Sequence, residues 1–118
     1  MARFLFVYRD CGESTTMITP AERQQQMQAW EKWLGEALRA GWMLDPGDAL
    51  TPEGRVVSGK AVTDGPFAET KEVVGGFSVV EAATIDDAAQ LARGCPGVVT
   101  GGTVEVRPLA GYTAKISP

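Results

Sequence analysis

The segment spanning residues 3–9 carries apolar side chains on both faces of an extended chain. These side chains alternate in the order Phe4, Leu5, Phe6, Val7 and Tyr8. Successive side chains of a strand point to opposite faces, so this pattern predicts a strand that needs cover on both sides. A fold with helices on one side only would leave the other side for a second molecule.

A long helix is predicted from Pro20 to about Ala40. Thr19 can cap it, Glu22 can complete a capping box, and Gly41 supplies a left-handed stop. Apolar residues at three- and four-residue spacing form one predicted buried stripe, made of Met27, Trp30, Leu34, Ala37 and Leu38. Trp33 lies off the centre of this stripe, and is either a residue at the edge of the core or an exposed anchor for a partner.

The remaining elements are shorter. Extended pieces at 42–44 and 49–50 flank a turn at 45–48, and a hairpin pairs 55–57 with 60–63 across Ser58 and Gly59. Strands are predicted at 76–81 and 103–108. A second helix starts at the Thr84 cap, ends at Gly94 and Pro96, and presents one apolar face with the members Ala88, Leu91, Ala92 and Cys95. Cys95 is therefore interpreted as a small core residue rather than a nucleophile.

This order predicts one domain over residues 1–118, of the α+β class. Strand, helix, strand, strand, helix, strand with an inserted hairpin is the ferredoxin-like arrangement, in which both helices cover one face of a mainly antiparallel sheet. Leu5 or Phe6, and Val79 or Val80, must then point to the bare face. We therefore expect a homodimer that is joined through this face.

The 118 residues include no histidine, which excludes whole classes of site. Ser-His-Asp and Cys-His nucleophiles, a histidine base, the usual zinc sites and a His-ligated haem are unavailable, so we expect no metal and no cofactor. The 11 basic and 15 acidic residues give a net charge of −4 with no basic patch, which argues against nucleic acid. Two widely spaced cysteines, and the absence of a signal peptide or membrane span, predict a reduced, cytoplasmic protein.

The most distinctive segment is VTDGPFAETKEVVGGF, at residues 62–77. Gly65 and Pro66 stiffen the chain after Asp64, and Phe67 is a large apolar anchor. A carboxylate at such a corner often accepts hydrogen bonds from nearby backbone N–H groups, which is a structural task. The alternative is that Asp64 faces a cleft as a proton carrier or a ligand contact.

Several motifs in order resemble the DGPF-type proteins of the YciI-like (YCII-related) family. They are VTDGPFAETKE with GGF, then Asp87-Ala88, then ARGCP at 92–96, and finally GTVEVRPL at 102–109. The resemblance implies a ferredoxin-like subunit that pairs sheet to sheet into a dimeric α+β barrel. It also implies an enzymatic role around a His-Asp pair in the YciI branch, and an association of DGPF-type members with extracytoplasmic-function sigma factors. Without histidine, only a carboxylate of that pair can be carried over, and Asp64 is the best-placed candidate.

Two functions follow from these candidates. The first is a small-molecule acid-base enzyme of isomerase or lyase type, with Asp64 as the catalytic residue. The second is a non-catalytic module that binds a small molecule, or a transcription partner such as a sigma factor through Trp33 or the charged segment 69–72. The candidate binding residues are Tyr8, Phe67, Glu81 and Arg107. For Arg107 the alternative is a structural ion pair with Glu105 on the same face of its strand.

Overall fold

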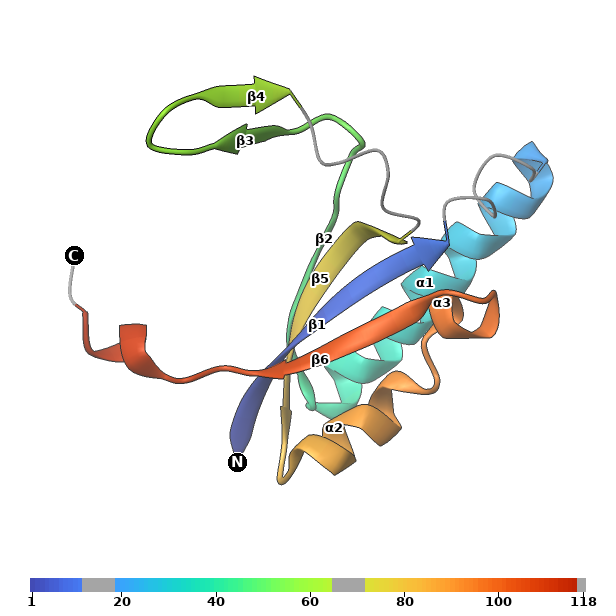
Figure 1. The fold of residues 1–118 in the computed structure, drawn as a ribbon. Helices are drawn as coiled ribbons and strands as arrows, with labels where there is room; N and C mark the ends of the chain where they lie inside the picture. Colours follow the sequence, from blue (N-terminus) through green and yellow to red (C-terminus); the bar gives the residue numbers. More distant parts are fainter. Residues whose placement is uncertain (12–18, 65–71, 117–118) are drawn as a thin grey trace.

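The computed structural model describes residues 1–11, 19–64 and 72–116 (Figure 1). The elements within these residues are β1 (Ala2–Cys11), α1 (Pro20–Ala40), β2 (Met43–Ala49), β3 (Arg55–Val57), β4 (Val62–Asp64), β5 (Glu72–Ala82), α2 (Ile85–Ala92), α3 (Pro96–Val99), β6 (Thr103–Pro108) and the 3₁₀ helix η1 (Tyr112–Lys115). None of the described helices has the length and hydropathy needed to cross a membrane.

Four strands form one antiparallel sheet in the order β2-β5-β1-β6. The helices α1, α2 and α3 lie on one side of this sheet (Figure 1). The α+β class is therefore confirmed, and the strand order fits the ferredoxin-like arrangement. We call the sheet face opposite the helices the open face.

The alternation along β1 decides which side chains enter the core. Phe4, Phe6 and Tyr8 are 8% exposed or less and point toward the helices, whereas Leu5 and Val7 are half-buried on the open face. The pattern continues across the sheet because Leu5 pairs with Val79 and Val7 pairs with Phe77. The open face therefore carries a cluster of four apolar side chains, two from each central strand.

The long helix has the predicted ends. The Thr19 hydroxyl accepts a hydrogen bond from the backbone N–H of Glu22 at 3.1 Å, and Gly41 ends α1 with a φ of 87°. The predicted buried stripe is wrong at its two outer members, because Met27 is 58% exposed and Leu38 is 43% exposed. Only Ala37 of this helix is fully buried. Met27 instead lines a pocket.

Trp33 is a core-edge residue, one of the two roles that the sequence left open. It is half-buried, and its ring lies 5.7 Å from the ring of Trp42 and 6.4 Å from that of Tyr8. Aromatic rings at such separations attract one another beyond their burial. The indole is thus committed to packing within the chain.

The second helix ends earlier than predicted. Helix α2 stops at Ala92, and Pro96 begins a separate short helix, α3, rather than only ending the previous one. Proline fits the first turn of a helix because the N–H that it lacks has no partner there in any case. Cys95 precedes α3 and is completely buried, so its assignment to the core is confirmed although it lies outside α2.

Strands β3 and β4 pair antiparallel as a separate two-stranded sheet that extends away from the main one (Figure 1). The second strand begins at Val62 rather than at residue 60, because Ser58 closes a wider turn. The backbone N–H of Ser58 donates to the carbonyl of Ala61 at 2.8 Å, and the Ser58 hydroxyl accepts from the N–H of Ala61 at 3.1 Å. Every residue of both strands is exposed.

Candidate functional site

A pocket of about 630 Å³ lies between helix α1 and the strands β2 and β5, and α3 contributes to one side. Its walls from α1 are largely apolar and include Met27, Trp30 and Leu34. The opposite wall is the segment Pro46–Ala49 of β2 with the first half of β5, including Gly75 and Gly76. Ligand sites in proteins have this size and this mainly apolar lining.

Two glycines allow β2 to approach β5 closely enough to form the floor of the pocket. Gly47 has a φ of 65°, and a Cβ at this position would collide with the carbonyl oxygen of Phe77. A Cβ on Gly76 would come within 2.8 Å of the carbonyl oxygen of Asp48. The turn is held by Asp45, whose carboxylate accepts a hydrogen bond from the N–H of Gly47 at 2.8 Å. The predicted turn at 45–48 is therefore an irregular part of one strand.

A chain of hydrogen bonds fixes the hydroxyl of Tyr8, a buried residue that lines the pocket. The Tyr8 hydroxyl donates to Ser78 Oγ at 2.8 Å, and Ser78 Oγ donates to the carbonyl oxygen of Pro46 at 2.7 Å. Because a carbonyl can only accept, the Ser78 proton must go to Pro46 and the Tyr8 proton must go to Ser78. Burial raises the pKa of the Tyr8 phenol well above its ordinary value, although the hydrogen bond with Ser78 opposes this rise. Tyr8 is therefore a neutral phenol at physiological pH.

Tryptophan side chains support Tyr8 from the helix side. The ring of Trp30 lies 4.8 Å from that of Tyr8 in an edge-to-face arrangement, and the ring of Trp33 lies 5.9 Å from that of Trp30. Rings locked in this way hold their positions without large rearrangement, which favours a preformed site. Trp30 itself is half-buried and lines the pocket.

Two carboxylates stand at the rim. Glu31 of α1 and Asp48 of β2 both line the pocket and are exposed. One oxygen of Asp48 accepts a hydrogen bond from the N–H of Ala49 at 2.8 Å, which orients the carboxylate. Among the described lining residues there is no lysine or arginine. The charged groups at the rim are therefore negative.

Asp64 lies apart from this pocket. It ends β4, its side chain is 96% exposed, and its carboxylate is 3.6 Å from the Nε of Arg55 across the hairpin. It is thus exposed to solvent and is not one of the described residues that line the pocket, and the corner that follows it, residues 65–71, lies outside the described residues. A catalytic role for Asp64 stays a prediction that rests on the sequence alone.

The other predicted site residues are dispersed. Tyr8 lines the pocket, Glu81 is half-buried on β5 in register with Arg3 of β1, and Phe67 lies outside the described residues. Arg107 is on β6, on the open face. Of the described members of this group, the structure brings only Tyr8 to the pocket.

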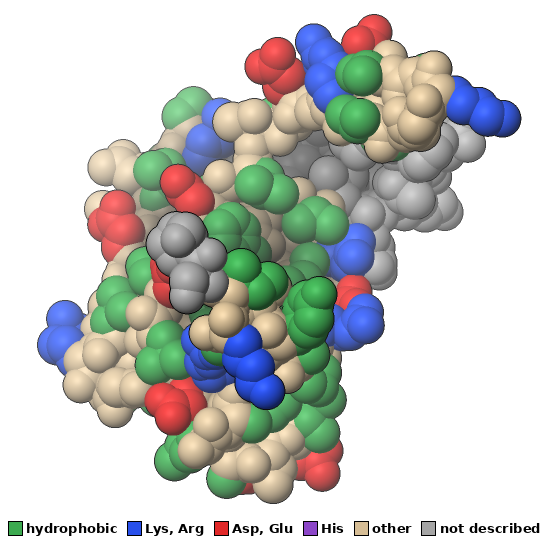
Figure 2. Space-filling model, turned by 90° about the vertical axis from the view of Figure 1, so that its left-hand side faces the viewer, with side chains coloured by type: hydrophobic (Ala, Val, Ile, Leu, Met, Phe, Trp, Pro, Cys, Tyr) green, Lys and Arg blue, Asp and Glu red, His purple; other side chains and the backbone are tan. Residues whose placement is uncertain are grey.

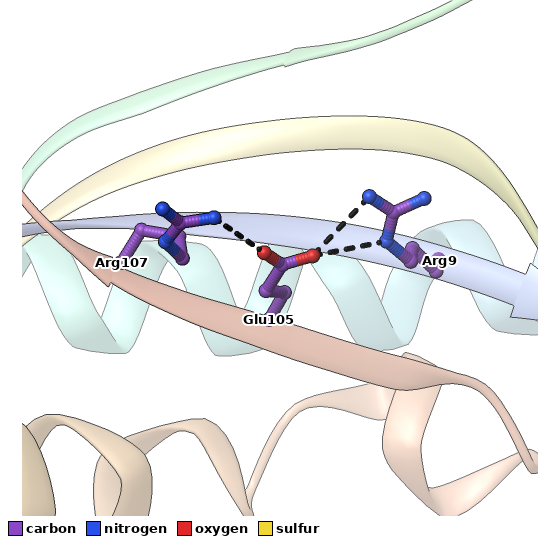
Figure 3. Close-up of polar contacts among 3 residues, drawn as sticks. All are labelled: Arg9, Glu105 and Arg107. Carbon is purple, nitrogen blue, oxygen red and sulfur yellow. Dashed lines mark hydrogen bonds and ion pairs between the residues drawn. The ribbon is translucent and has the colours of Figure 1, made fainter.

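Arg107 has the structural partner that was weighed against a binding role. Its guanidinium donates to Glu105 at 3.1 Å, and Arg9 of β1 donates to the other oxygen of the same carboxylate at 3.2 Å and 3.3 Å (Figure 3). The hydrogen bonds from Arg107 and then Arg9 lower the pKa of Glu105. Two guanidiniums on one carboxylate leave one net positive charge at this edge of the open face.

The sequence reasoning missed Ser78, Trp30 and the backbone of Pro46 as parts of the site. One signal could have indicated Ser78, because it is a hydroxyl at an inward position of a strand whose other inward members are Gly76, Val80 and Ala82. A buried polar side chain needs a partner, which points to a neighbouring strand. Within the described ranges, no three His, Cys, Asp or Glu side chains gather into a potential metal site.

Comparisons with known proteins agree with the arrangement of the elements. A family model described as the YCII-related domain matches residues 2–111. An uncharacterised protein of Rhizobium meliloti (strain 1021) is 48% identical over 52 residues, which cover 43% of this chain and 42% of that protein. The match thus spans less than half the length of that relative.

Proposed function

The chain belongs to the YCII-related domain family, and we propose that it binds a small organic molecule in the pocket between α1, β2 and β5. The observation that carries this proposal is a fixed polar group in the lining of the pocket. The buried phenol of Tyr8 is neutral and donates a hydrogen bond to Ser78, and its ring packs edge to face against that of Trp30. Apolar walls supply affinity for a ligand skeleton, and a few fixed polar groups supply its orientation.

Binding is favoured over acid-base chemistry at Asp64 by the positions of the carboxylates. An isomerase or lyase of the kind that the sequence suggested needs a carboxylate within hydrogen-bond reach of its substrate, with a pKa raised by burial. The side chain of Asp64 is 96% exposed on the hairpin and is not among the residues that line the pocket. Among the described residues, its ion-pair partner is the exposed Arg55 of the same hairpin.

The alternative of a regulatory module for a transcription protein has less support. It depended on Trp33 or on the charged segment 69–72. Trp33 packs against Tyr8, Trp30 and Trp42 within the chain. Residues 69–71 lie outside the described residues, so this part of the alternative rests on the sequence alone.

The binding unit that we propose is a homodimer joined through the open face, which would complete a dimeric α+β barrel. Figure 2 views the molecule from this side and shows hydrophobic side chains gathered in its middle, with charged groups around them. Leu5, Val7 and Val79 are half-buried there, and Phe77 is 36% exposed. A partly covered apolar cluster on a sheet is stabilised when a second apolar surface removes it from water.

The ligand proposal is tested by thermal shift and tryptophan fluorescence over a panel of metabolites, because binding to the native state raises its melting temperature. A variant with Ala49→Phe, at a lining residue, should lose the shift for every compound that binds in the pocket. Ala29→Phe, at an exposed position of α1 outside the lining, is the matched control and should keep it. Compounds that shift Ala49→Phe as strongly as the wild type would show that the pocket is not the binding site.

A further inference from the structure

We propose that the pocket selects ligands that donate hydrogen bonds and carry positive charge, namely primary or secondary amines on an aromatic or other apolar skeleton. This inference rests on the proposed function, since it names the ligand class of the same pocket. Three independent features of the lining support it: the direction of the buried hydrogen-bond chain, the sign of the charges at the rim, and the chemistry of the apolar wall.

The buried hydrogen-bond chain leaves the oxygen of Tyr8, a residue that lines the pocket, as a hydrogen-bond acceptor. Its proton is committed to Ser78, because the proton of Ser78 is committed in turn to the Pro46 carbonyl. What remains on the phenol oxygen is lone-pair capacity. A ligand N–H or O–H can satisfy it, whereas a carboxylate or phosphate oxygen would meet a second acceptor.

The charges at the rim act in the same direction. Glu31 and Asp48 are the charged side chains among the described lining residues. One oxygen of Asp48 is occupied by the N–H of Ala49, and in the described part of the chain its second oxygen accepts no hydrogen bond. An ammonium group gains attraction from both carboxylates, whereas an anion is repelled by both and finds no lysine or arginine in this part of the lining.

The apolar wall is suited to an organic cation. The half-buried Trp30 presents an aromatic ring to the pocket, and Met27 adds a polarisable thioether. Tryptophan is the side chain that attracts cations most strongly through its ring face. The same two side chains can also pack against an aromatic skeleton, so this wall can recognise both the positive charge and the aromatic ring of a ligand.

The test uses compounds in triads, in which one aromatic skeleton carries an ammonium, a hydroxyl or a carboxylate group. Phenethylamine, phenethyl alcohol and hydrocinnamate form the first triad, and larger bicyclic skeletons extend the series. Titration calorimetry should show that the ammonium member binds more tightly than the carboxylate member by about tenfold or more. The preference should weaken as the salt concentration rises.

Matched variants test whether the carboxylates at the rim cause the preference for ammonium over carboxylate compounds. The double variant Glu31→Gln and Asp48→Asn should reduce the ammonium preference to about threefold or less, because both rim charges are removed while their shapes stay. The control Glu36→Gln and Asp86→Asn removes two exposed carboxylates outside the lining and should keep the preference. A preference that survives in the first double variant would overturn the role of the rim.

The two proposals fail in different ways. Suppose that compounds bind to the wild type and not to Ala49→Phe, while the carboxylate members bind as tightly as the ammonium members. In that case the proposed ligand class is wrong, but the pocket is still the binding site. If no compound of any triad binds up to about 1 mM, or Ala49→Phe binds as well as the wild type, then the proposed function fails and this inference fails with it.

Discussion

The hydroxyl of Tyr8 lies 2.8 Å from Ser78 Oγ, although the two residues are 70 positions apart in the chain. This bond joins β1 to β5 inside the core, and its direction is set by Pro46, whose carbonyl oxygen is 2.7 Å from the same Oγ. Three segments thus meet in one hydrogen-bond chain, and two of its members, Tyr8 and Pro46, line the pocket.

Ser78→Ala should lower the free energy of unfolding by about 1–3 kcal/mol, because it leaves the Tyr8 hydroxyl and the Pro46 carbonyl without their buried partner. Tyr8→Phe should cost less, about 0.5–1.5 kcal/mol, since Ser78 keeps its bond to Pro46. Urea denaturation of both single variants and the double variant measures the coupling. Strictly additive effects would contradict a shared hydrogen-bond chain.

Gly47→Ala should destabilise the protein by about 3 kcal/mol or more, because the left-handed backbone strains an L-residue and the added Cβ collides with a carbonyl. Gly47 has a φ of 65° and lies against Phe77. Gly59→Ala is the control, since a Cβ at that position would meet no atom of the described residues within 4 Å beyond its chain neighbours. Thermal and urea unfolding should find Gly59→Ala near neutral, and equal costs for the two variants would argue against the close approach of β2 to β5.

Glu105→Gln should reduce stability at neutral pH and lose its effect in acid. Arg107 and Arg9 lower the pKa of Glu105, so its contribution is fully present above the ordinary value of 4.5 and disappears as the pH falls through the lowered folded value. Denaturation of wild type and variant between pH 7 and about pH 2 measures the difference. Glu36→Gln, at an exposed carboxylate without an ion pair among the described residues, is the control and should show no such pH-dependent difference.

Asp64→Asn should change the free energy of unfolding by less than about 1 kcal/mol, because its ion pair with Arg55 is exposed to solvent and the hairpin is held by backbone bonds. Compounds that bind in the pocket should bind this variant as they bind the wild type. Denaturation and calorimetry check the two statements. Loss of ligand binding or of turnover in Asp64→Asn would restore this carboxylate to the site.

Val79→Lys should convert the proposed dimer into a folded monomer. Val79 lies in the apolar cluster of the open face, where a lysine can reach water in the monomer but would be buried without a partner in the dimer. Val99→Lys, at a 77% exposed position on the helix side, should leave the dimer intact. Sedimentation at micromolar concentration distinguishes them, and a wild type that is already monomeric would overturn the dimer.

Local sequence determined the main elements, the ends of the long helix and the alternation of β1, but not the separate helix α3 or the single irregular strand β2. Alternation along β1 and the pair Thr19 and Gly41 around α1 act within a few residues, so they can be interpreted without tertiary information. The order of elements then limits the topology to few choices, and the ferredoxin-like order followed. The ion pair of Glu105 and Arg107 could be weighed for the same reason, because both lie two residues apart on one strand.

Only the tertiary structure decided which residues make the pocket. Tyr8, Trp30, Pro46 and Ser78 are brought together by strand pairing between distant segments, and no local pattern encodes such a meeting. Met27 fits a buried helical stripe by spacing, yet it is exposed because the pocket opens beside it. Asp64 stands in the most distinctive motif, but the hairpin extends it away from the sheet. The periodicity of the sequence determines which face of a helix or strand is apolar. The packing of the whole chain determines whether that face contacts the core, a pocket or solvent.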